Sequence, residues 1–409
     1  MHPIAIAYLL LATAAPSVAG SLSTPIVQDD HRAAQVNTED PVGWLLSTAS
    51  EAAALMPLKP HVKTRSRLQV AVVESALAVG RGEFASAQVP GIANWRRGLA
   101  QAKIAVHYAE AGNREKAEAA LAEAQEIEKG ITDEFDQGWR RDRVRVTMAR
   151  VFALLGDTKT AAAIQLQAVP GEAGRLATLS THAIQEEHLD QQIATLGEIA
   201  ENGEMEQVKY ALLSVAELYG RFYDSAERRA SLEALIRDKW KAMPLEPRIE
   251  VLESLAAYDV AHNNLDHARA IADEVTVIVT GNRWNMEQSV AMHGRAADLL
   301  ALSDQADKAH ALLSEAMTLY GKLEPKIVSI YRGQALRPIA ESYVKLGAED
   351  AAVAIYQRAL TEALVNPNSR PRAEDLVATC ASIVESGLTP PRSLLRSVAQ
   401  VRQNLGAPW

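Results

Sequence analysis

Small residues recur at intervals of about 40 residues along this chain, each within an amphipathic helical pattern. The clearest unit spans residues 339–359, where Ala340 and Tyr343 precede Gly347, and Ala352 and Tyr356 follow it. Because Ala340 and Ala352 are small, two consecutive helices can approach closely there, and the tyrosines fill the seam between them. The pattern predicts a helical hairpin, which can bury its apolar face only against a neighbouring hairpin.

A second unit, residues 99–124, carries matching residue types at the same offsets, with Ala105, Tyr108 and Gly112 in its first half. The small residue of the first helix therefore marks the position of each hairpin along the sequence, and we call its copies the register residues. They are separated by 44, 34, 33, 40, 41, 43 and 40 residues and are Ala105, Ala149, Ala183, Ala216, Ala256, Ala297, Ala340 and Cys380. The copies at Ala183 and Ala216 are weak, because Thr195 and Arg228 stand where the second helix should carry a small residue.

These hairpins resemble the tetratricopeptide repeat, whose two helices carry small residues at their closest crossing and a glycine at the turn. The resemblance covers residues 62–387. The resemblance is to the broad tetratricopeptide-like class and not to a consensus member. Most copies lack the tryptophan and the proline of the consensus repeat, and their period is often longer than that of the consensus. The resemblance implies an all-α fold, an α-solenoid or superhelix of antiparallel helix–turn–helix hairpins, with a curved surface that suits a protein or peptide partner.

The chain divides into four expected parts. Residues 1–19 contain an apolar run that ends at Pro16, followed by Ser17, Val18 and Ala19, which is typical of a signal peptide cleaved after Ala19. Export to the periplasm or beyond is the prediction, and a buried N-terminal helix is the alternative. Residues 20–40 are expected to be a flexible linker, residues 41–387 the repeat region, and residues 388–409 a C-terminal capping helix and tail. Asp40 is expected to cap the first helix.

Composition limits the partners. The formal net charge of -9 and the pI of about 5.7 argue against nucleic acid, because phosphate binding needs a basic surplus. No segment after the leader approaches the roughly 20 apolar residues that a membrane span requires. The sequence leaves the oligomeric state open.

The sequence gives little support for a catalytic site or a metal site. Cys380 occupies a register position, which favours a structural filler over a reactive thiol. Asp259 and His262 have helical metal-ligand spacing and His267 follows the turn, but solvated polar residues are the more common occupants of such a place. The sequence contains no glycine-rich phosphate loop and no nucleophile elbow. We therefore predict no enzymatic activity, no catalytic residue, no metal and no cofactor.

The most unusual local feature is an arginine-rich stretch, residues 139–150. The register places several cations on the inner side of the first helices, where spaced arginines could bind an acidic or C-terminal carboxylate peptide by bidentate pairing. We call these candidates the groove set: Lys103, Trp139, Arg143, Arg150, Arg295 and Arg337. The favoured alternative is that the cations pair with carboxylates of adjacent repeats, for instance Asp133, Glu134 and Asp136.

The leading hypothesis is a non-enzymatic scaffold of the cell envelope that binds a protein or peptide on a curved surface. A small-ligand-binding protein or enzyme, with a site in the hollow of the superhelix at Trp139, Arg143 and Arg150, is the first alternative. A structural element that self-associates through its end repeats is the second.

Overall fold

The computed structural model describes residues 39–131, 138–167 and 189–409, and within these ranges the protein is all-α. The expected signal peptide, most of the expected linker and the register residue Ala183 lie outside them. The N-terminal helices are α1 Pro41–Leu55, α2 Leu58–Ala78, α3 Gly82–Gln88, α4 Arg96–Glu110, α5 Arg114–Lys129, α6 Gly138–Leu154 and α7 Thr158–Gln167. The next group is α9 Leu189–Asn202, α10 Met205–Arg221, α11 Ala226–Lys239, α12 Leu245–Ala261 and α13 Leu265–Gly281. The last group is α14 Met286–Leu302, α15 Ala306–Leu323, α16 Ser329–Lys345, α17 Glu349–Val365, α18 Ser369–Glu385 and α19 Arg392–Gln403.

Consecutive helices pack as hairpins, as the small-residue pattern predicted. All seven described register residues are buried: Ala105, Ala149, Ala216, Ala256, Ala297, Ala340 and Cys380. Burial raises the pKa of the Cys380 thiol to about 12, so this cysteine stays protonated and acts as an apolar filler.

The turn of each hairpin falls seven residues after the register residue. Six of these turn residues have a positive φ: Gly112, Gly156, Asn263, Asp304, Gly347 and Gly387. A residue with positive φ reverses the chain after a helix, and glycine, asparagine and aspartate tolerate that conformation best. The exception follows Ala216, where the turn position is occupied by Tyr223, which is buried.

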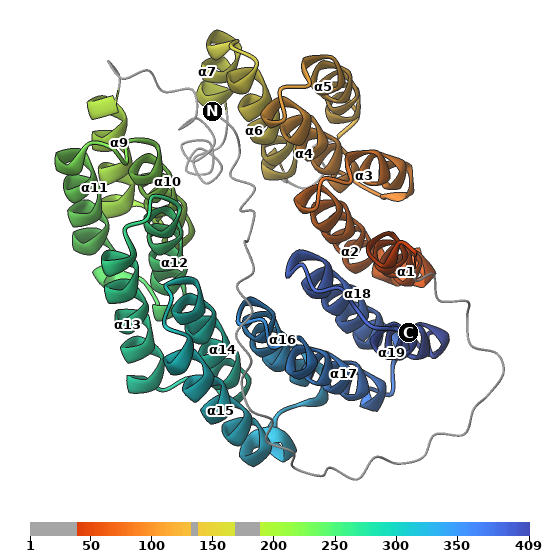
Figure 1. The fold of residues 1–409 in the computed structure, drawn as a ribbon. Coiled ribbons are helices and arrows are strands. Elements are labelled where there is room, and N and C mark those ends of the chain that lie inside the picture. Colours follow the sequence, from red (N-terminus) through yellow and green to blue (C-terminus); the bar gives the residue numbers. More distant parts are fainter. Residues whose placement is uncertain (1–38, 132–137, 168–188) are drawn as a thin grey trace, which may run out of the picture.

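The first helices of the hairpins form one curved row, and the second helices lie on its outer side (Figure 1). Within the described residues each member of this inner row contacts the next, in the order α10, α12, α14, α16, α18, α2, α4 and α6. The first and the last described helices therefore meet in the middle of the row, where α1 and α2 pack against α18, and we call this contact the chain-end junction. One apolar cluster joins both ends, with Leu45 and Val73 from one and Leu376 and Val398 from the other.

The closest approach in the row is between α14 and α16. A Cβ at Gly294 would lie 2.8 Å from the backbone of Pro338 and Ile339, so only glycine fits there. Ser342 Oγ uses this proximity to donate a hydrogen bond of 2.7 Å to the Gly294 carbonyl. Pro338 lies inside α16 without ending it.

The last helix, α19, turns its polar residues to solvent as expected, with Arg392, Arg396 and Gln400 exposed. Its other face packs on α17 and α18 and also touches α1. A terminal cap would have no further neighbour, whereas this helix is followed in space by the start of the chain. No helix of the described ranges is long and apolar enough to cross a membrane.

Candidate functional site

An ion pair joins each pair of neighbouring helices along the inner row. From one end of the row to the other, the pairs are Lys209–Glu250 (2.6 Å), Arg295–Glu253 (2.5 Å), Lys345–Asp298 (2.5 Å), Arg337–Asp375 (3.2 Å), Arg67–Glu374 (3.7 Å), Lys103–Glu74 (2.9 Å) and Arg150–Glu110 (2.5 Å). We call this series the ion-pair ladder. It continues across the junction of α18 with α2, where the two chain ends meet.

Four members of the groove set are rungs of this ladder: Lys103, Arg150, Arg295 and Arg337. Each pairs with a carboxylate of the neighbouring helix, which agrees with the alternative of pairing between adjacent repeats. The partners differ from those suggested, since Asp133, Glu134 and Asp136 lie outside the described residues. A peptide carboxylate would have to displace a resident one to reach these four cations.

One acid of the ladder, Asp375, has a perturbed pKa because it is buried. Asp375 is 6% exposed, and burial raises its pKa to about 6 although Arg337 lies beside it. Its Oδ1 accepts a hydrogen bond from Arg337, whereas its Oδ2 is buried without a partner.

The other two members of the groove set, Trp139 and Arg143, belong to a cluster of stacked aromatic and cationic side chains. Trp139 at the start of α6 meets Trp95, the residue before α4, edge to face at 5.5 Å between ring centroids. Arg143 lies 5.0 Å from the Trp139 centroid and 5.9 Å from that of Trp95. Arg140 lies over Trp139 at 5.5 Å and Arg96 over Trp95 at 4.7 Å. We call these five residues the Trp–Arg cluster.

Positive charge accumulates at the Trp–Arg cluster. Burial lowers the pKa of Arg96, and the nearby charges of Arg67, Arg140 and Arg143 lower it further. Among the described residues, no carboxylate lies within 4 Å of Arg96 or Arg140, and Arg140 Nε is buried without a hydrogen-bond partner. Trp139 is 36% exposed, so part of the aromatic surface is open to a ligand.

Sequence reasoning found Trp139 and Arg143 but missed Trp95 and Arg96. Trp95 lies just before α4, outside the repeat unit that the register defines, and it is 6% exposed. The available signal was the pair of tryptophan–arginine dipeptides at the starts of two successive inner helices, Trp95-Arg96 and Trp139-Arg140.

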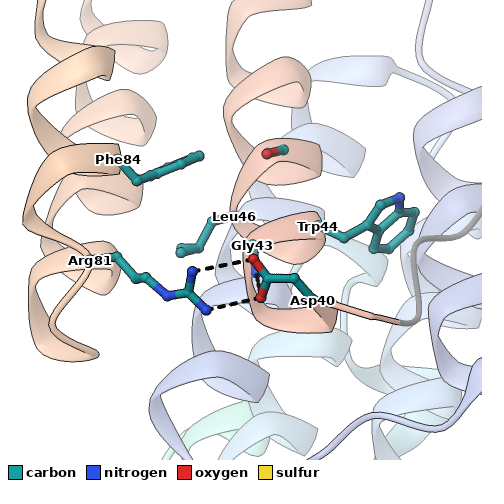
Figure 2. Close-up of a pocket in the computed structure, with 7 residues that line it drawn as sticks. Asp40, Gly43, Trp44, Leu46, Arg81 and Phe84 are labelled. Carbon is teal, nitrogen blue, oxygen red and sulfur yellow. Dashed lines mark hydrogen bonds and ion pairs between the residues drawn. The ribbon is translucent and has the colours of Figure 1, made fainter.

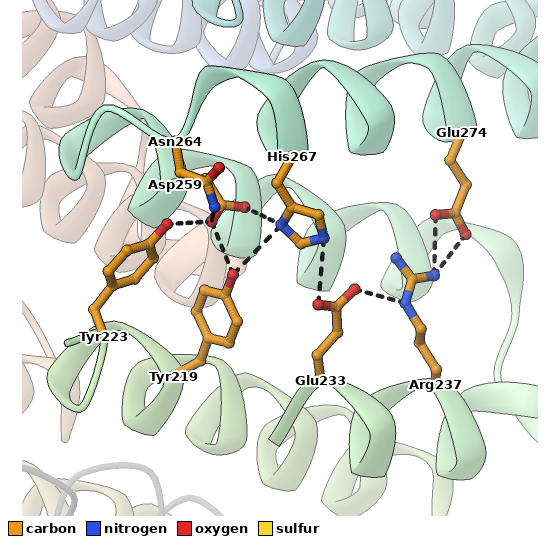
Figure 3. Close-up of polar contacts among 8 residues, drawn as sticks. All are labelled: Tyr219, Tyr223, Glu233, Arg237, Asp259, Asn264, His267 and Glu274. Atoms are coloured by element: carbon orange, nitrogen blue, oxygen red, sulfur yellow. Dashed lines mark hydrogen bonds and ion pairs between the residues drawn. The ribbon is translucent and has the colours of Figure 1, made fainter. Parts of the chain in front are cut away.

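A second polar constellation, the Asp259 network, links α10, α11, α12 and α13 (Figure 3). Asp259 is fully buried at the end of α12. It accepts hydrogen bonds from Tyr223 (2.7 Å), Tyr219 (2.8 Å), Asn264 (3.3 Å) and His267 Nδ1 (2.7 Å).

His267 extends this network toward solvent. Its Nε2 lies 3.3 Å from Glu233, and Glu233 accepts a hydrogen bond from Arg237, which also pairs with Glu274. The hydrogen bond to Asp259, and then that to Glu233, raises the pKa of His267 to about 10. The same contact with His267, together with Arg237, lowers the pKa of Glu233 to about 2. His267 is therefore an imidazolium at neutral pH, with both nitrogens engaged, and it cannot act as a general base there.

Among the register turns that the structure describes, the turn after Ala216 lacks a positive φ, and it lies at the Asp259 network. Tyr223 stands where the other hairpins have glycine, asparagine or aspartate, and its hydroxyl reaches Asp259 in the next hairpin. His262, the metal-ligand candidate paired with Asp259, stacks on Tyr223 at 3.9 Å between ring centroids. In the described part of the chain, no group of three or more histidine, cysteine or acidic side chains is arranged to hold a metal ion.

The start of the repeat region carries a pocket of about 320 Å³ between α1 and α3 (Figure 2). Asp40 caps α1, as expected, by accepting a 3.0 Å hydrogen bond from the Gly43 amide. Arg81 grips the same carboxylate with both terminal nitrogens, at 2.9 and 3.2 Å. The Gly43 hydrogen bond and Arg81 lower the pKa of Asp40, so the carboxylate is already committed to helix capping.

Comparisons with known proteins leave the family open. No family model matches the chain, and the search of curated proteins found no match. Among solved structures, the chain is similar to a "circular tandem repeat protein with novel repeat topology and enhanced subunit contact surfaces" at 13% identity, over 88% of this chain and 95% of that one. The TM-score is 0.24, so the helical-repeat architecture stated above rests on the helices and contacts of this chain itself.

Proposed function

We propose that this chain is a non-enzymatic scaffold that binds an acidic protein segment at the Trp–Arg cluster of its inner row. The resemblance of the hairpins to tetratricopeptide repeats supports a protein or peptide as the partner. A row of hairpins presents an extended surface, because each hairpin buries its apolar face against its neighbours and leaves the inner edge uncovered.

The observation that carries this proposal is the contrast between the cluster and the ladder. Each ladder cation already has a carboxylate on the neighbouring helix, whereas Arg96 and Arg140 have none within 4 Å among the described residues. Burial, and then repulsion from Arg67, Arg140 and Arg143, lowers the pKa of Arg96, and an added carboxylate would offset that repulsion. An anion can therefore contact Arg96 and Arg140 without displacing a carboxylate of the described residues.

The tryptophans give the site its second recognition element. Trp139 offers an open ring edge beside Arg140, and arginine planes stacked on indole rings keep their outer donors free for bidentate contacts. Such a surface suits a segment in which aspartate or glutamate alternates with apolar or aromatic residues.

The direct test is binding of a fluorescein-labelled hexaglutamate amide to the full chain, followed by fluorescence anisotropy. The double substitution Arg96→Gln and Arg140→Gln should weaken binding by about tenfold or more, because it removes charge-assisted hydrogen bonds worth roughly 1.5–3 kcal/mol each. Added salt should weaken the wild-type interaction.

The matched control is Arg396→Gln, which removes an exposed arginine of α19 that is remote in sequence from the cluster and should leave the affinity unchanged. Hexaglutamine amide should bind at least about tenfold more weakly than hexaglutamate. Equal binding of the two peptides, or equal loss in Arg396→Gln and the double variant, would refute the proposal.

Export belongs to the same proposal. It rests on the apolar run and the Ser17-Val18-Ala19 sequence, which fit a leader removed after Ala19. Edman sequencing of the protein recovered from a cell-envelope fraction should begin at Gly20. Recovery of an intact amino terminus from the cytoplasm would overturn it.

A further inference from the structure

The junction between the chain ends holds a pocket that belongs neither to the Trp–Arg cluster nor to the Asp259 network. It has a volume of about 370 Å³ and lies among α2, α16 and α18. We propose that this pocket binds a small free carboxylate with an apolar ring or branched chain, an activity distinct from peptide binding at the cluster.

Two arginines of the pocket have guanidinium N–H groups that make no hydrogen bond to a described residue. Arg67 and Arg370 face the same residue, Glu374, at 3.7 and 3.9 Å, distances beyond a hydrogen bond. Neither guanidinium donates a hydrogen bond to any described residue, and their side chains are 63% and 51% exposed. A ligand carboxylate placed between them would gain charge-assisted contacts that Glu374 does not supply.

The charge of the lining favours an anion. Arg67, Arg337 and Arg370 contribute three positive charges, and Glu374 and Asp375 contribute two negative ones, which leaves a surplus of one. Arg337 is held by Asp375 at 3.2 Å in the wall, so the two exposed arginines carry the surplus at the mouth.

Apart from Gln334, the rest of the lining is largely apolar and partly exposed. Ile330 is 41% exposed and Tyr331 40%, and both line the pocket together with buried Leu68. Val328, beside them at the start of α16, is 59% exposed. Large apolar side chains gathered at an opening that also carries two arginines without hydrogen bonds to Glu374 indicate a ligand with an apolar body and one anionic group.

The size of the pocket argues for a single small molecule over a chain segment. Its volume lies near the lower end of the range of small-molecule sites, about 300–1,000 Å³. A free carboxylate with one ring fits within such a space and can place its charge at the rim.

The experiment titrates the full chain with phenylacetate and, separately, with the neutral isostere phenylacetamide, by ligand-observed NMR. Phenylacetate should bind at least about tenfold more tightly than phenylacetamide, because only the carboxylate engages Arg67 and Arg370. Arg370→Gln should weaken phenylacetate binding about tenfold and leave phenylacetamide binding unchanged. Tyr331→Ala should weaken both ligands.

Arg396→Gln serves as the matched charge control and should change neither affinity. Unchanged thermal midpoints would show that Arg370→Gln leaves the fold intact, as expected for a half-exposed side chain. Equal affinity for phenylacetate and phenylacetamide, an unaffected Arg370→Gln variant, or absence of phenylacetate binding up to its solubility limit would each overturn the proposal. These outcomes do not decide whether hexaglutamate binds at the Trp–Arg cluster, because that proposal is tested by the effect of substituting Arg96 and Arg140.

Discussion

The α14–α16 junction and the α18–α2 junction occupy equivalent places in the inner row but are held in different ways. At α14–α16 the backbones nearly touch, because Gly294 admits Pro338 and Ile339. At α18–α2 the contact runs through side chains, with Ser75 Oγ donating to Glu385 at 2.6 Å and the longest ladder pair, Arg67–Glu374, at 3.7 Å. The meeting of the chain ends therefore depends on buried apolar surface, to which α1 contributes, more than on close helix crossing.

The largest loss of stability is expected from a charge introduced into the apolar core of the chain-end junction. Leu45 in α1 is fully buried in the apolar cluster shared by both ends. Leu45→Asp should cost more than about 4 kcal/mol of unfolding free energy, because the carboxylate would be buried without a partner. Urea unfolding measures the loss.

Cleavage of the chain allows the chain-end junction to be tested by the association of two fragments, without a measurement of global stability. If the chain is cleaved within residues 168–188, the two pieces should coelute in size-exclusion chromatography, held by α1 and α2 against α18. The Leu45→Asp pieces should elute separately. Separation of the wild-type pieces would mean that the chain-end junction is too weak to hold the row together.

The α14–α16 junction is tested by a pair of glycine substitutions with opposite expected signs. Gly294→Ala should destabilise by about 1–3 kcal/mol, because the new Cβ would overlap backbone atoms at 2.8 Å. Gly321→Ala in α15, where nothing lies within 4 Å of the added Cβ, should stabilise by roughly 0.5–1 kcal/mol. Two destabilised variants would show that the close crossing does not set the cost.

The Asp259 network joins α10, α11, α12 and α13, which follow one another along the chain, and it makes the stability of their packing depend on pH. The folded pKa of His267 is about 10, above its ordinary value of 6.5. Its stabilisation is therefore complete below about pH 6.5 and is lost as the pH rises through about 10. The wild type should lose about 1–2 kcal/mol relative to His267→Gln over that interval, measured by urea unfolding at each pH. Parallel pH profiles would contradict this assignment.

The smallest effect is expected at the rim of the chain-end junction. Arg402 of α19 pairs with Glu51 of α1 at 2.5 Å, but the two side chains are 35% and 55% exposed. Glu51→Gln should change the unfolding free energy by less than about 0.5 kcal/mol. A loss above about 1 kcal/mol would show that charge pairing, and not apolar burial, holds α1 in place.

Much of the fold could be predicted because it depends on contacts within one hairpin. Register residues are buried wherever the structure describes them, and the turn position seven residues later explains why Asn263 and Asp304 can replace glycine. The junction of the chain ends could not be predicted, because periodicity identifies neighbours along the sequence and carries no signal for hairpins that meet from opposite ends. Pairing of Arg337 with a carboxylate of the adjacent repeat was predicted as the favoured alternative, but its partner Asp375, 38 residues away on another helix, was not identified.

The candidate site was predicted only in part for a related reason. The sequence alone does not distinguish an inner-face arginine that pairs with a carboxylate of the next helix, such as Arg295, from one that lies over an indole ring, such as Arg140. The distinction depends on the rotation between neighbouring helices, which the spacing of small residues does not determine.

The position of the chain ends has a practical consequence for the gene. Because α19 lies against α1, a linker could join the carboxyl terminus to residue 39, just before α1, and new termini could be opened between α7 and α9. Such a circular permutant would begin at α9, end at α7 and read the whole row in spatial order. In this permutant, α19 and α1 would be joined by an ordinary internal loop.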